Sequence, residues 1–297
     1  MAFERPPRVL ALDLDGTLIT DYGNWREPVS RENLIALAEL RTAGTRVVIC
    51  TGRSVSSTRS ILERTGDAAL LACDLITHSG GATLSAGGEV LATHPLPREE
   101  AASLLALYRE HGLDPILFEN LARGGACLYE RDPSNPRMAR YMAARAREEG
   151  DGGLLRRVDR LEDHLDEDPL SLGTIDTAGK LNLAYDAMAA LDLPGSRIAL
   201  QNLVSMEGET LHFFLEAFGR DASKEAAFRE YCALRGCSID RAAAMGDGRN
   251  DMGLIGAVGF GIAMGNAPEE LKAVADHVAP DFDRNGVAAA IRACLLP

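Results

Sequence analysis

The sequence predicts an α/β fold in which a parallel sheet is interrupted by a second domain. A buried strand is expected over Arg8–Leu14, a helix after the capping residue Ser30, and a second buried strand over Thr45–Cys50. A strand, a helix and a strand within about forty residues form a βαβ unit, whose two strands run parallel. Strand-like and helix-like segments alternate in a similar way near the C-terminus, whereas the residues in between follow a different pattern.

The first domain junction is expected where glycines interrupt the chain. A second helix is predicted after Ser54, and paired glycines then punctuate a hairpin with arms Ala82–Ser85 and Glu89–Ala92. We therefore assign residues 1–82 to the first part of the core domain.

Residues 83–211 are expected to form a separate α/β domain, because helical and strand-like stretches alternate there. The segment Asp159–Pro169 is strongly acidic, which indicates a solvated surface or a loop. The expected helices are Ala101–His111 and Pro136–Glu149, and the expected strands are Ile116–Phe118, Ala126–Tyr129, Leu172–Ile175 and Arg197–Leu200.

Residues 212–297 are expected to return to the core domain, again with alternating strands and helices. Ser223 is a suitable cap for the first of the helices. The expected strands are Phe213–Ala217, Ala242–Met245 and Phe260–Met264, and the expected helices are Lys224–Arg235, Glu269–Ala275 and Val287–Leu295.

The amino-acid composition of the chain argues against some classes of binding partner. The formal net charge is −13 and aromatic residues make up 5% of the chain, so neither a nucleic-acid surface nor a membrane surface is expected. A small phosphorylated substrate is still compatible, because a metal ion and a local cation can reverse the field in a pocket. With no apolar run of eighteen residues, no signal-peptide pattern and no C-x-x-C pair among six cysteines, we expect a cytoplasmic protein with reduced thiols.

Two carboxylates follow the first predicted strand. Asp13 and Asp15 are two residues apart, so in an extended backbone their side chains point to one side. Adjacent carboxylates repel each other unless a cation or a shared proton intervenes, and hard oxygen ligands of this kind suit Mg²⁺. A solvated acidic loop is the alternative, but two acids that abut a buried apolar strand favour a metal-assisted site.

Three further elements also follow predicted strands, where ligands bind in open parallel sheets. Thr51-Gly52-Arg53 offers a hydroxyl and an unobstructed backbone N–H to an anion, although a capping threonine and a turn glycine explain it equally well. Lys224 could neutralise a phosphate, but by itself it reads as an exposed helix lysine. Gly246–Asp251 ends a buried strand with an acid and a second Asn-Asp pair, which could complete a metal site.

Together these elements resemble a known family. Asp13-Leu14-Asp15-Gly16-Thr17 resembles the first motif of the haloacid dehalogenase-like (HAD) superfamily. Thr51, Lys224 and Gly246-Asp247…Asn250-Asp251 resemble its second, third and fourth motifs in order. The tail Ala263–Glu270 is similar to the Cof-type subfamily (subfamily IIB). That subfamily often has Asn-Gly where this chain has Ser79-Gly80-Gly81, a departure that touches the hinge between the domains.

The resemblance implies a Rossmann-like core, formed by residues 1–82 and 212–297, with an inserted α/β cap of the C2 type over residues 83–211 that controls substrate access. It also implies a magnesium-dependent phosphatase for small phosphate monoesters, with sugar phosphates as the leading class. Asp13 would attack phosphorus to form an aspartyl-phosphate, and Asp15 would act as general acid and then general base.

The remaining residues take supporting roles in this scheme. Mg²⁺ would be bound by Asp13, the backbone carbonyl of Asp15 and Asp247, while Asp251 would orient its water from outside the coordination sphere. The phosphoryl oxygens would be held by Thr51, the N–H of Gly52, Lys224 and Asn250.

Two other functions are compatible with the same motifs. A phosphotransferase or phosphomutase would require a bisphosphate activator, and a non-catalytic sugar-phosphate sensor would bind without turnover. The sequence leaves the physiological substrate and the oligomeric state open.

Overall fold

The computed structural model describes residues 6–19, 28–149, 154–204 and 210–296. The chain forms two compact units: a core unit of Met1–Ala92 with Ser223–Pro297, and an inserted unit of Thr93–Ala222. The expected boundaries, after residues 82 and 211, therefore differ from these by about ten residues each. The reason is that the hairpin after residue 82 extends the core sheet, while the strand around residue 213 pairs inside the inserted unit.

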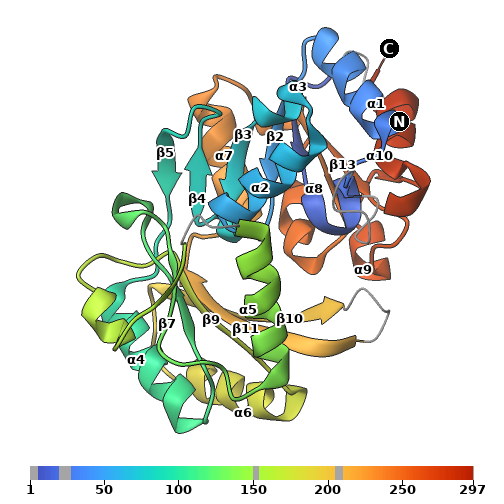
Figure 1. Ribbon diagram of the computed structural model, residues 1–297. Helices are drawn as coiled ribbons and strands as arrows, with labels where there is room; N and C mark the ends of the chain where they lie inside the picture. Colours follow the sequence, from blue (N-terminus) through green and yellow to red (C-terminus); the bar gives the residue numbers. More distant parts are fainter. Residues whose placement is uncertain (1–5, 20–27, 150–153, 205–209, 297) are drawn as a thin grey trace. The chain divides into compact units, whose positions relative to one another are not determined.

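The core unit is organised by one mixed sheet, drawn in Figure 1. Within the described residues it has eight strands in the order β14-β13-β12-β1-β2-β3-β4-β5. β1 lies between β12 and β2 and runs parallel to both, and β4 runs antiparallel to β3. The strands are β1 (Val9–Leu12), β2 (Arg46–Cys50), β3 (Asp74–Thr77), β4 (Ala82–Leu84), β5 (Val90–Thr93), β12 (Ala242–Gly246), β13 (Phe260–Ala263) and β14 (His277–Val278).

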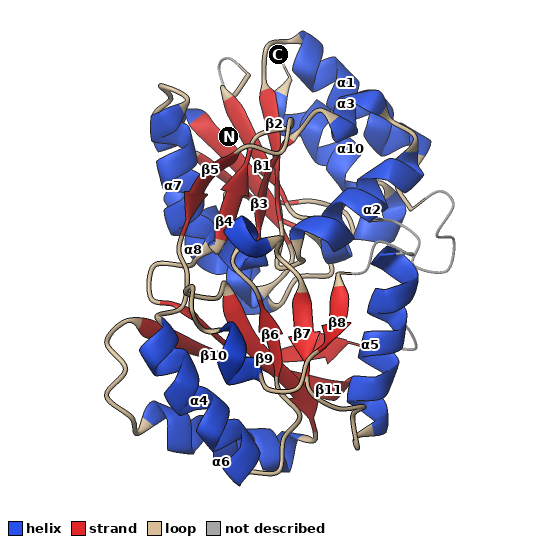
Figure 2. Cartoon of the chain, turned by 60° about the vertical axis from the view of Figure 1, so that its left-hand side comes forward, coloured by secondary structure: helices blue, strands red, loops and turns tan. Residues whose placement is uncertain are grey.

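Helices cover both faces of this sheet, as Figure 2 shows. Alternation along β1 explains why: Leu10 and Leu12 enter one hydrophobic layer, whereas Val9 and Ala11 enter the other. The first layer is covered by α1 (Arg31–Thr42), α2 (Val55–Thr65), α3 (Ala68–Leu71) and α10 (Gly286–Ala290), and the second by α7 (Lys224–Leu234), α8 (Met252–Ala257) and α9 (Glu269–Lys272).

The expected helix caps are found in the core unit. The hydroxyl oxygens of Ser30, Ser54 and Ser223 accept hydrogen bonds from the backbone N–H groups three residues later. Each cap satisfies an N–H that the helix itself cannot pair, which fixes where α1, α2 and α7 begin.

The inserted unit is built on a second sheet, which within the described residues has six strands in the order β10-β11-β9-β6-β7-β8. Its α4 and α6 pack on one face, around Leu117 and Leu172. Its α5 lies on the other face, where the rings of Tyr141 and Phe214 are 5.9 Å apart. The elements are α4 (Arg98–Glu110), β6 (Ile116–Phe118), β7 (Cys127–Tyr129), α5 (Pro136–Glu149), β8 (Leu155–Arg157), β9 (Ser171–Asp176), α6 (Ala178–Ala189), β10 (Ser196–Val204) and β11 (Thr210–Gly219).

One expectation about this region needs correction, and another is confirmed. Phe213–Ala217 is a strand, but as part of β11 it pairs antiparallel with β9 and β10 and does not join the core sheet. The acidic segment Asp159–Pro169 is a loop with one helical turn, Leu161–His164, as expected, and within it Leu161 is buried. Alternation alone cannot say which sheet a strand joins, since that depends on partners far away in the sequence.

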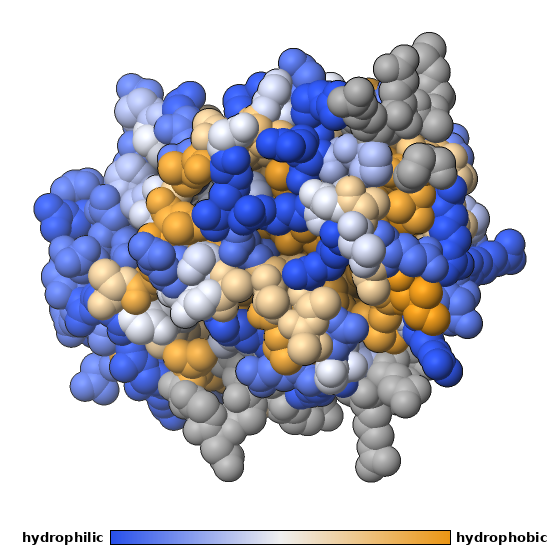
Figure 3. Space-filling model, turned by 90° about the horizontal axis from the view of Figure 1, so that it is seen from above, coloured by the Kyte–Doolittle hydropathy of each residue, from blue (hydrophilic) through white to orange (hydrophobic). Residues whose placement is uncertain are grey.

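The helices, the surface and the cysteines can be described in terms of hydrophobicity and burial. In the part of the chain that the structure describes, no helix is both long enough and apolar enough to cross a bilayer. The view from above in Figure 3 shows hydrophilic residues between separate hydrophobic ones. All six cysteines are free thiols, and five of them are buried.

The inserted unit also buries an acidic side chain, Glu216 on β11. Its Oε1 accepts a hydrogen bond of 3.0 Å from the hydroxyl of Ser171, and 5% of the residue is exposed. Burial raises the pKa of Glu216 from 4.5 to about 8, against the opposing effects of the Ser171 hydroxyl and of Arg197.

This burial predicts a pH-dependent stability. Because the folded-state pKa is the higher one, the contribution of protonated Glu216 is complete below pH 4.5 and is lost as the pH rises through about 8. Replacing it with neutral glutamine, Glu216→Gln, should remove a slope of at most about 1.4 kcal/mol per pH unit in that window. Urea unfolding followed by circular dichroism at several pH values checks this, and equal slopes for both proteins would contradict it.

A tight turn after β3 brings the chain against the start of α7. Gly80 has φ +100°, and a Cβ placed there would lie 2.2 Å from the backbone oxygen of Ser223. Gly44 has a similar φ of +98°, but a Cβ there would have no atom within 4 Å. The two glycines therefore share a backbone requirement and differ in the space around them.

We expect Gly80→Ala to destabilise the protein more than Gly44→Ala. Both substitutions cost about 1–2 kcal/mol for the left-handed backbone, and overpacking against Ser223 adds about 1–3 kcal/mol to Gly80→Ala alone. The free energies of unfolding in urea give the difference. If the two variants lose the same stability, the close approach of this turn to α7 is wrong.

Candidate active site

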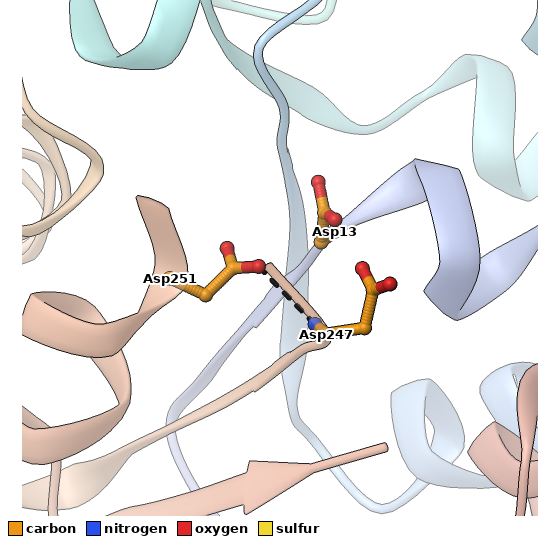
Figure 4. Close-up of side chains that lie close together, drawn as sticks. All are labelled: Asp13, Asp247 and Asp251. Atoms are coloured by element: carbon orange, nitrogen blue, oxygen red, sulfur yellow. Dashed lines mark hydrogen bonds between the residues drawn. The ribbon is translucent and has the colours of Figure 1, made fainter. Parts of the chain in front are cut away.

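Three carboxylates meet at the carboxyl-terminal edge of the core sheet. Asp13 directly follows β1, Asp247 directly follows β12, and Asp251 ends the helical turn Arg249–Asp251. Each offers an oxygen atom, and these atoms all lie within 4.8 Å of one another (Figure 4). They converge because β1 and β12 are parallel neighbours, so that both strands end at the same edge.

A buried ammonium group holds two of these carboxylates. The Nζ of Lys224, the first residue of α7, lies 2.8 Å from Oδ1 of Asp13 and 2.7 Å from Oδ1 of Asp251. Lys224 is 2% exposed, so its interpretation as an exposed helix lysine is wrong. Burial lowers the pKa of Lys224, but Asp13 and Asp251 outweigh that effect and hold it well above its usual value.

The Asp13 carboxylate is buried next to two other carboxylates. Burial raises the pKa of Asp13, Lys224 opposes the rise, and the neighbouring Asp251 and Asp247 add to it. A carboxylate in such a place remains charged only if cations balance it, and one ammonium cannot balance three carboxylates.

Asp251 organises the loop that carries Asp247. Its Oδ2 accepts hydrogen bonds from the N–H groups of Asp247 (3.2 Å) and Gly248 (2.9 Å), while its Oδ1 accepts from Lys224. A Cβ on Gly246 would lie 2.4 Å from the Asp251 carboxyl carbon, so this packing requires glycine there. Asp251 therefore has both oxygens engaged within the protein.

Asp247 contacts neutral donors. Asn266 Nδ2 donates to its Oδ2 at 3.0 Å, and the Thr17 hydroxyl donates to its Oδ1 at 3.4 Å. Gly16 has φ +70°, and a Cβ on it would lie 2.1 Å from Asp247 Oδ2. Burial, followed by repulsion from Asp251, raises the pKa of Asp247 to about 7. Three carboxylates around one ammonium fit the hard oxygen ligands that a divalent metal such as Mg²⁺ prefers.

Asp15 does not pair with Lys224 but with the guanidinium group of Arg53. Arg53 holds its carboxylate with two hydrogen bonds, from Nε to Oδ2 (2.6 Å) and from a terminal nitrogen to Oδ1 (2.7 Å), and also donates to Ser57. Arg53 was expected in the possible anion site, but its contact with Asp15 was not expected. Two-point pairing of this kind fixes the plane of the carboxylate as well as its position.

The second motif lies at the same edge of the sheet. Thr51 follows β2, is 1% exposed, and accepts a hydrogen bond from the N–H of Arg53 at 3.1 Å. A Cβ placed on Gly52 would lie 3.8 Å from the side-chain nitrogen of Asn250, so these two residues are close. The eight candidate site residues predicted from the sequence are thus grouped at one edge of the core sheet.

Asn266 was not among the selected residues, although it lies within the tail that carries the subfamily resemblance. Its amide nitrogen contacts both the Gly16 backbone oxygen and Asp247, each at 3.0 Å. It ties the loop after β1 to the loop after β12.

The buried ion pairs predict a large effect of removing the ammonium. Lys224→Met leaves Asp13 and Asp251 buried without their cation, and we expect it to cost about 3–5 kcal/mol of unfolding free energy in EDTA. Lys272→Met is the matched control, because Lys272 pairs with the exposed Glu269 within α9, where about 0–1 kcal/mol is at stake. Urea unfolding measures both, and similar losses would argue against the buried network.

The chain is similar to known proteins over nearly its whole length. A family model described as haloacid dehalogenase-like hydrolase matches residues 10–291. Phosphatase YwpJ of Bacillus subtilis is 25% identical over 299 residues, covering 95% of this chain and 97% of the relative. Pyridoxal phosphate phosphatase YbhA of Escherichia coli is 25% identical over 286 residues, covering 95% and 96%.

Solved structures share the fold over nearly the full length. A haloacid dehalogenase-like hydrolase from Bacteroides thetaiotaomicron has a TM-score of 0.77 at 23% identity and covers 97% of this chain and 99% of its own. The sugar phosphatase BT4131, described as HAD subclass IIB, has a TM-score of 0.74 at 21% identity, with 96% and 98% covered. Since the family model spans nearly the whole chain and the motifs resembling that family meet at one sheet edge, the chain belongs to the haloacid dehalogenase-like hydrolases.

Proposed function

We propose that the protein is a magnesium-dependent phosphatase that hydrolyses small phosphate monoesters, with sugar phosphates as the leading class, through an aspartyl-phosphate. The observation that carries this proposal is the buried Asp13 carboxylate, held by Lys224 beside Asp247 at the ligand-binding edge of the sheet. The names of curated relatives, which include several phosphatases, support the same reaction class.

Asp13 acts as the nucleophile. Lys224 binds its Oδ1, which orients the carboxylate and leaves Oδ2 to attack phosphorus. The bond between Oδ2 and phosphorus forms as the bond to the ester oxygen breaks, and Asp15 donates a proton to the departing oxygen. Asp15 then takes a proton from water, which attacks the aspartyl-phosphate, releases inorganic phosphate and restores Asp13.

Arg53 positions Asp15 for the second half of this cycle. Its paired hydrogen bonds favour the ionised carboxylate, which is the form that can take a proton from water. In the first half Asp15 must carry a proton, and the charge of the arriving phosphate offsets that of the guanidinium. Arg53 is therefore a positioning residue in this proposal.

The metal site is proposed from the same residues. Asp13, the backbone carbonyl of Asp15 and Asp247 would hold Mg²⁺, and Asp251 would support the site from outside the coordination sphere. When bound, the metal would supply positive charge that offsets repulsion between Asp13 and the phosphate. Thr51, the Gly52 N–H, Lys224 and Asn250 would hold the phosphoryl oxygens.

We propose that the inserted unit, Thr93–Ala222, is the cap that controls substrate access. Its boundaries replace the expected 83–211. A cap of this kind excludes water and selects the leaving group, so it would decide which phosphate ester is used.

Release of inorganic phosphate from a panel of small esters tests the function. The panel should contain sugar phosphates, glyceryl phosphate, phosphoglycolate and nucleotide-derived phosphates, each with Mg²⁺ and with EDTA. Magnesium-dependent release supports the phosphatase. Turnover that needs a bisphosphate activator would point to a phosphomutase, and binding without any turnover would point to a sensor.

Substitutions of the two proposed catalytic carboxylates are predicted to affect turnover differently. Asp13→Asn should lower phosphate release to the background, because the amide is not a competent nucleophile. Asp15→Asn should lower turnover by about 10²–10⁴-fold and leave Mg²⁺ affinity unchanged, because its backbone carbonyl remains. Phosphate assays and calorimetric Mg²⁺ titrations measure these effects, with circular dichroism to verify folding. Near-normal turnover of Asp13→Asn would refute its role.

A further inference from the structure

A hollow lies at the edge of the core sheet opposite to the carboxylates. Its volume is about 460 Å³, and the starts of β1, β2 and β3 line it, together with the ends of α1 and α7. Val9 and Asp13 stand at opposite ends of β1 and are therefore about 13 Å apart along an extended strand. The hollow is thus separate from the candidate active site.

The walls of this hollow are strongly basic in an acidic protein. Among the described residues that line it, four are arginines and Asp74 is the one acid. Asp74 is already engaged, by Arg235 at 2.6 Å and by the hydroxyl of Tyr231 at 2.7 Å. A chain with a net charge of −13 therefore has here a site with three more positive than negative charges.

Helix electrostatics explains two of the arginines. Arg41 lies in the last turn of α1 and Arg235 caps the end of α7, where the helix dipole favours cations. Both also have fixed partners: Arg41 donates to the Ala69 backbone oxygen, and Arg235 stacks over the Tyr231 ring at 5.3 Å. Contacts within the protein thus account for the positions of these two side chains.

The other two arginines need a different explanation. Arg8 and Arg46 lie where the neighbouring strands β1 and β2 begin, outside the helices, and both are exposed. Arg46 reaches Asp74 at 3.8 Å, and among the described residues the Arg8 side chain has neither a hydrogen bond nor a salt bridge. Both side chains carry a positive charge at the rim of one hollow, and these charges attract an anion to it.

We propose that this hollow binds a small anion with two or more phosphate groups. Guanidinium groups match phosphate oxygens in charge and geometry, and an excess of three positive charges suits a ligand with more than one phosphate. The volume lies in the range of small-molecule sites, about 300–1,000 Å³, and exceeds what one phosphate needs. Val9 and Val47 give the hollow an apolar floor.

Methylenebisphosphonate, which phosphatases cannot hydrolyse, is the probe. It would be titrated calorimetrically into the full-length protein in EDTA, where the unneutralised carboxylates of the active site repel anions. We expect one site per chain and weaker binding of methylphosphonate. Arg46→Gln and Arg8→Gln should each weaken binding by about tenfold or more.

Two controls locate the site. Arg292→Gln removes an arginine of similar exposure that pairs with Glu39 elsewhere on the core unit, and it should leave the affinity unchanged. Asp13→Asn should also leave it unchanged. The proposal is overturned if the wild type does not bind the probe, if Asp13→Asn abolishes binding, or if Arg292→Gln weakens it as much as Arg46→Gln. Because the test requires no turnover, its outcome is independent of the proposed phosphatase function.

Discussion

The buried ammonium of Lys224 is the interaction on which the candidate active site depends. Asp13 and Asp251 are nearly inaccessible to water, and each adds a negative charge to a region that already contains Asp247. Removing ionised carboxylates from water costs several kcal/mol each, so they can be placed together only because Lys224 lies within 2.8 Å of two of them. The remaining negative charge is what makes this place suited to a metal ion.

The position of Lys224 in turn depends on backbone packing. The Ser223 cap begins α7 at this point, and the turn after β3 can approach it because Gly80 has no side chain. Gly16 and Gly246 likewise lack a side chain where Asp247 and Asp251 approach the backbone closely. The parallel sheet brings the strand ends together, and glycines allow the loops beyond them to close to hydrogen-bonding distance.

Much of this arrangement was predictable from the sequence, because it follows from local patterns. The apolar strand before Asp13, the capping serines and the order of the four motifs led to an α/β core and to eight residues at one edge. The membership of β11 was not predictable, since Phe213–Ala217 has the alternation of a strand but its partners, β9 and β10, are chosen by tertiary packing. The pairing of Arg53 with Asp15 was missed for a similar reason: side chains 38 residues apart reveal a contact only once the loops are placed.

Detection of a phosphorylated Asp13 would test the central proposal most directly. Full-length protein would be mixed with Mg²⁺ and an activated phosphate ester, quenched in acid during turnover, and digested for mass spectrometry. The proposed mechanism requires a phosphate group on the peptide that contains Asp13, and its absence from the Asp13→Asn variant. Steady phosphate release by the wild type, with no phosphorylated peptide at any time of quenching, would contradict the role of Asp13 as nucleophile.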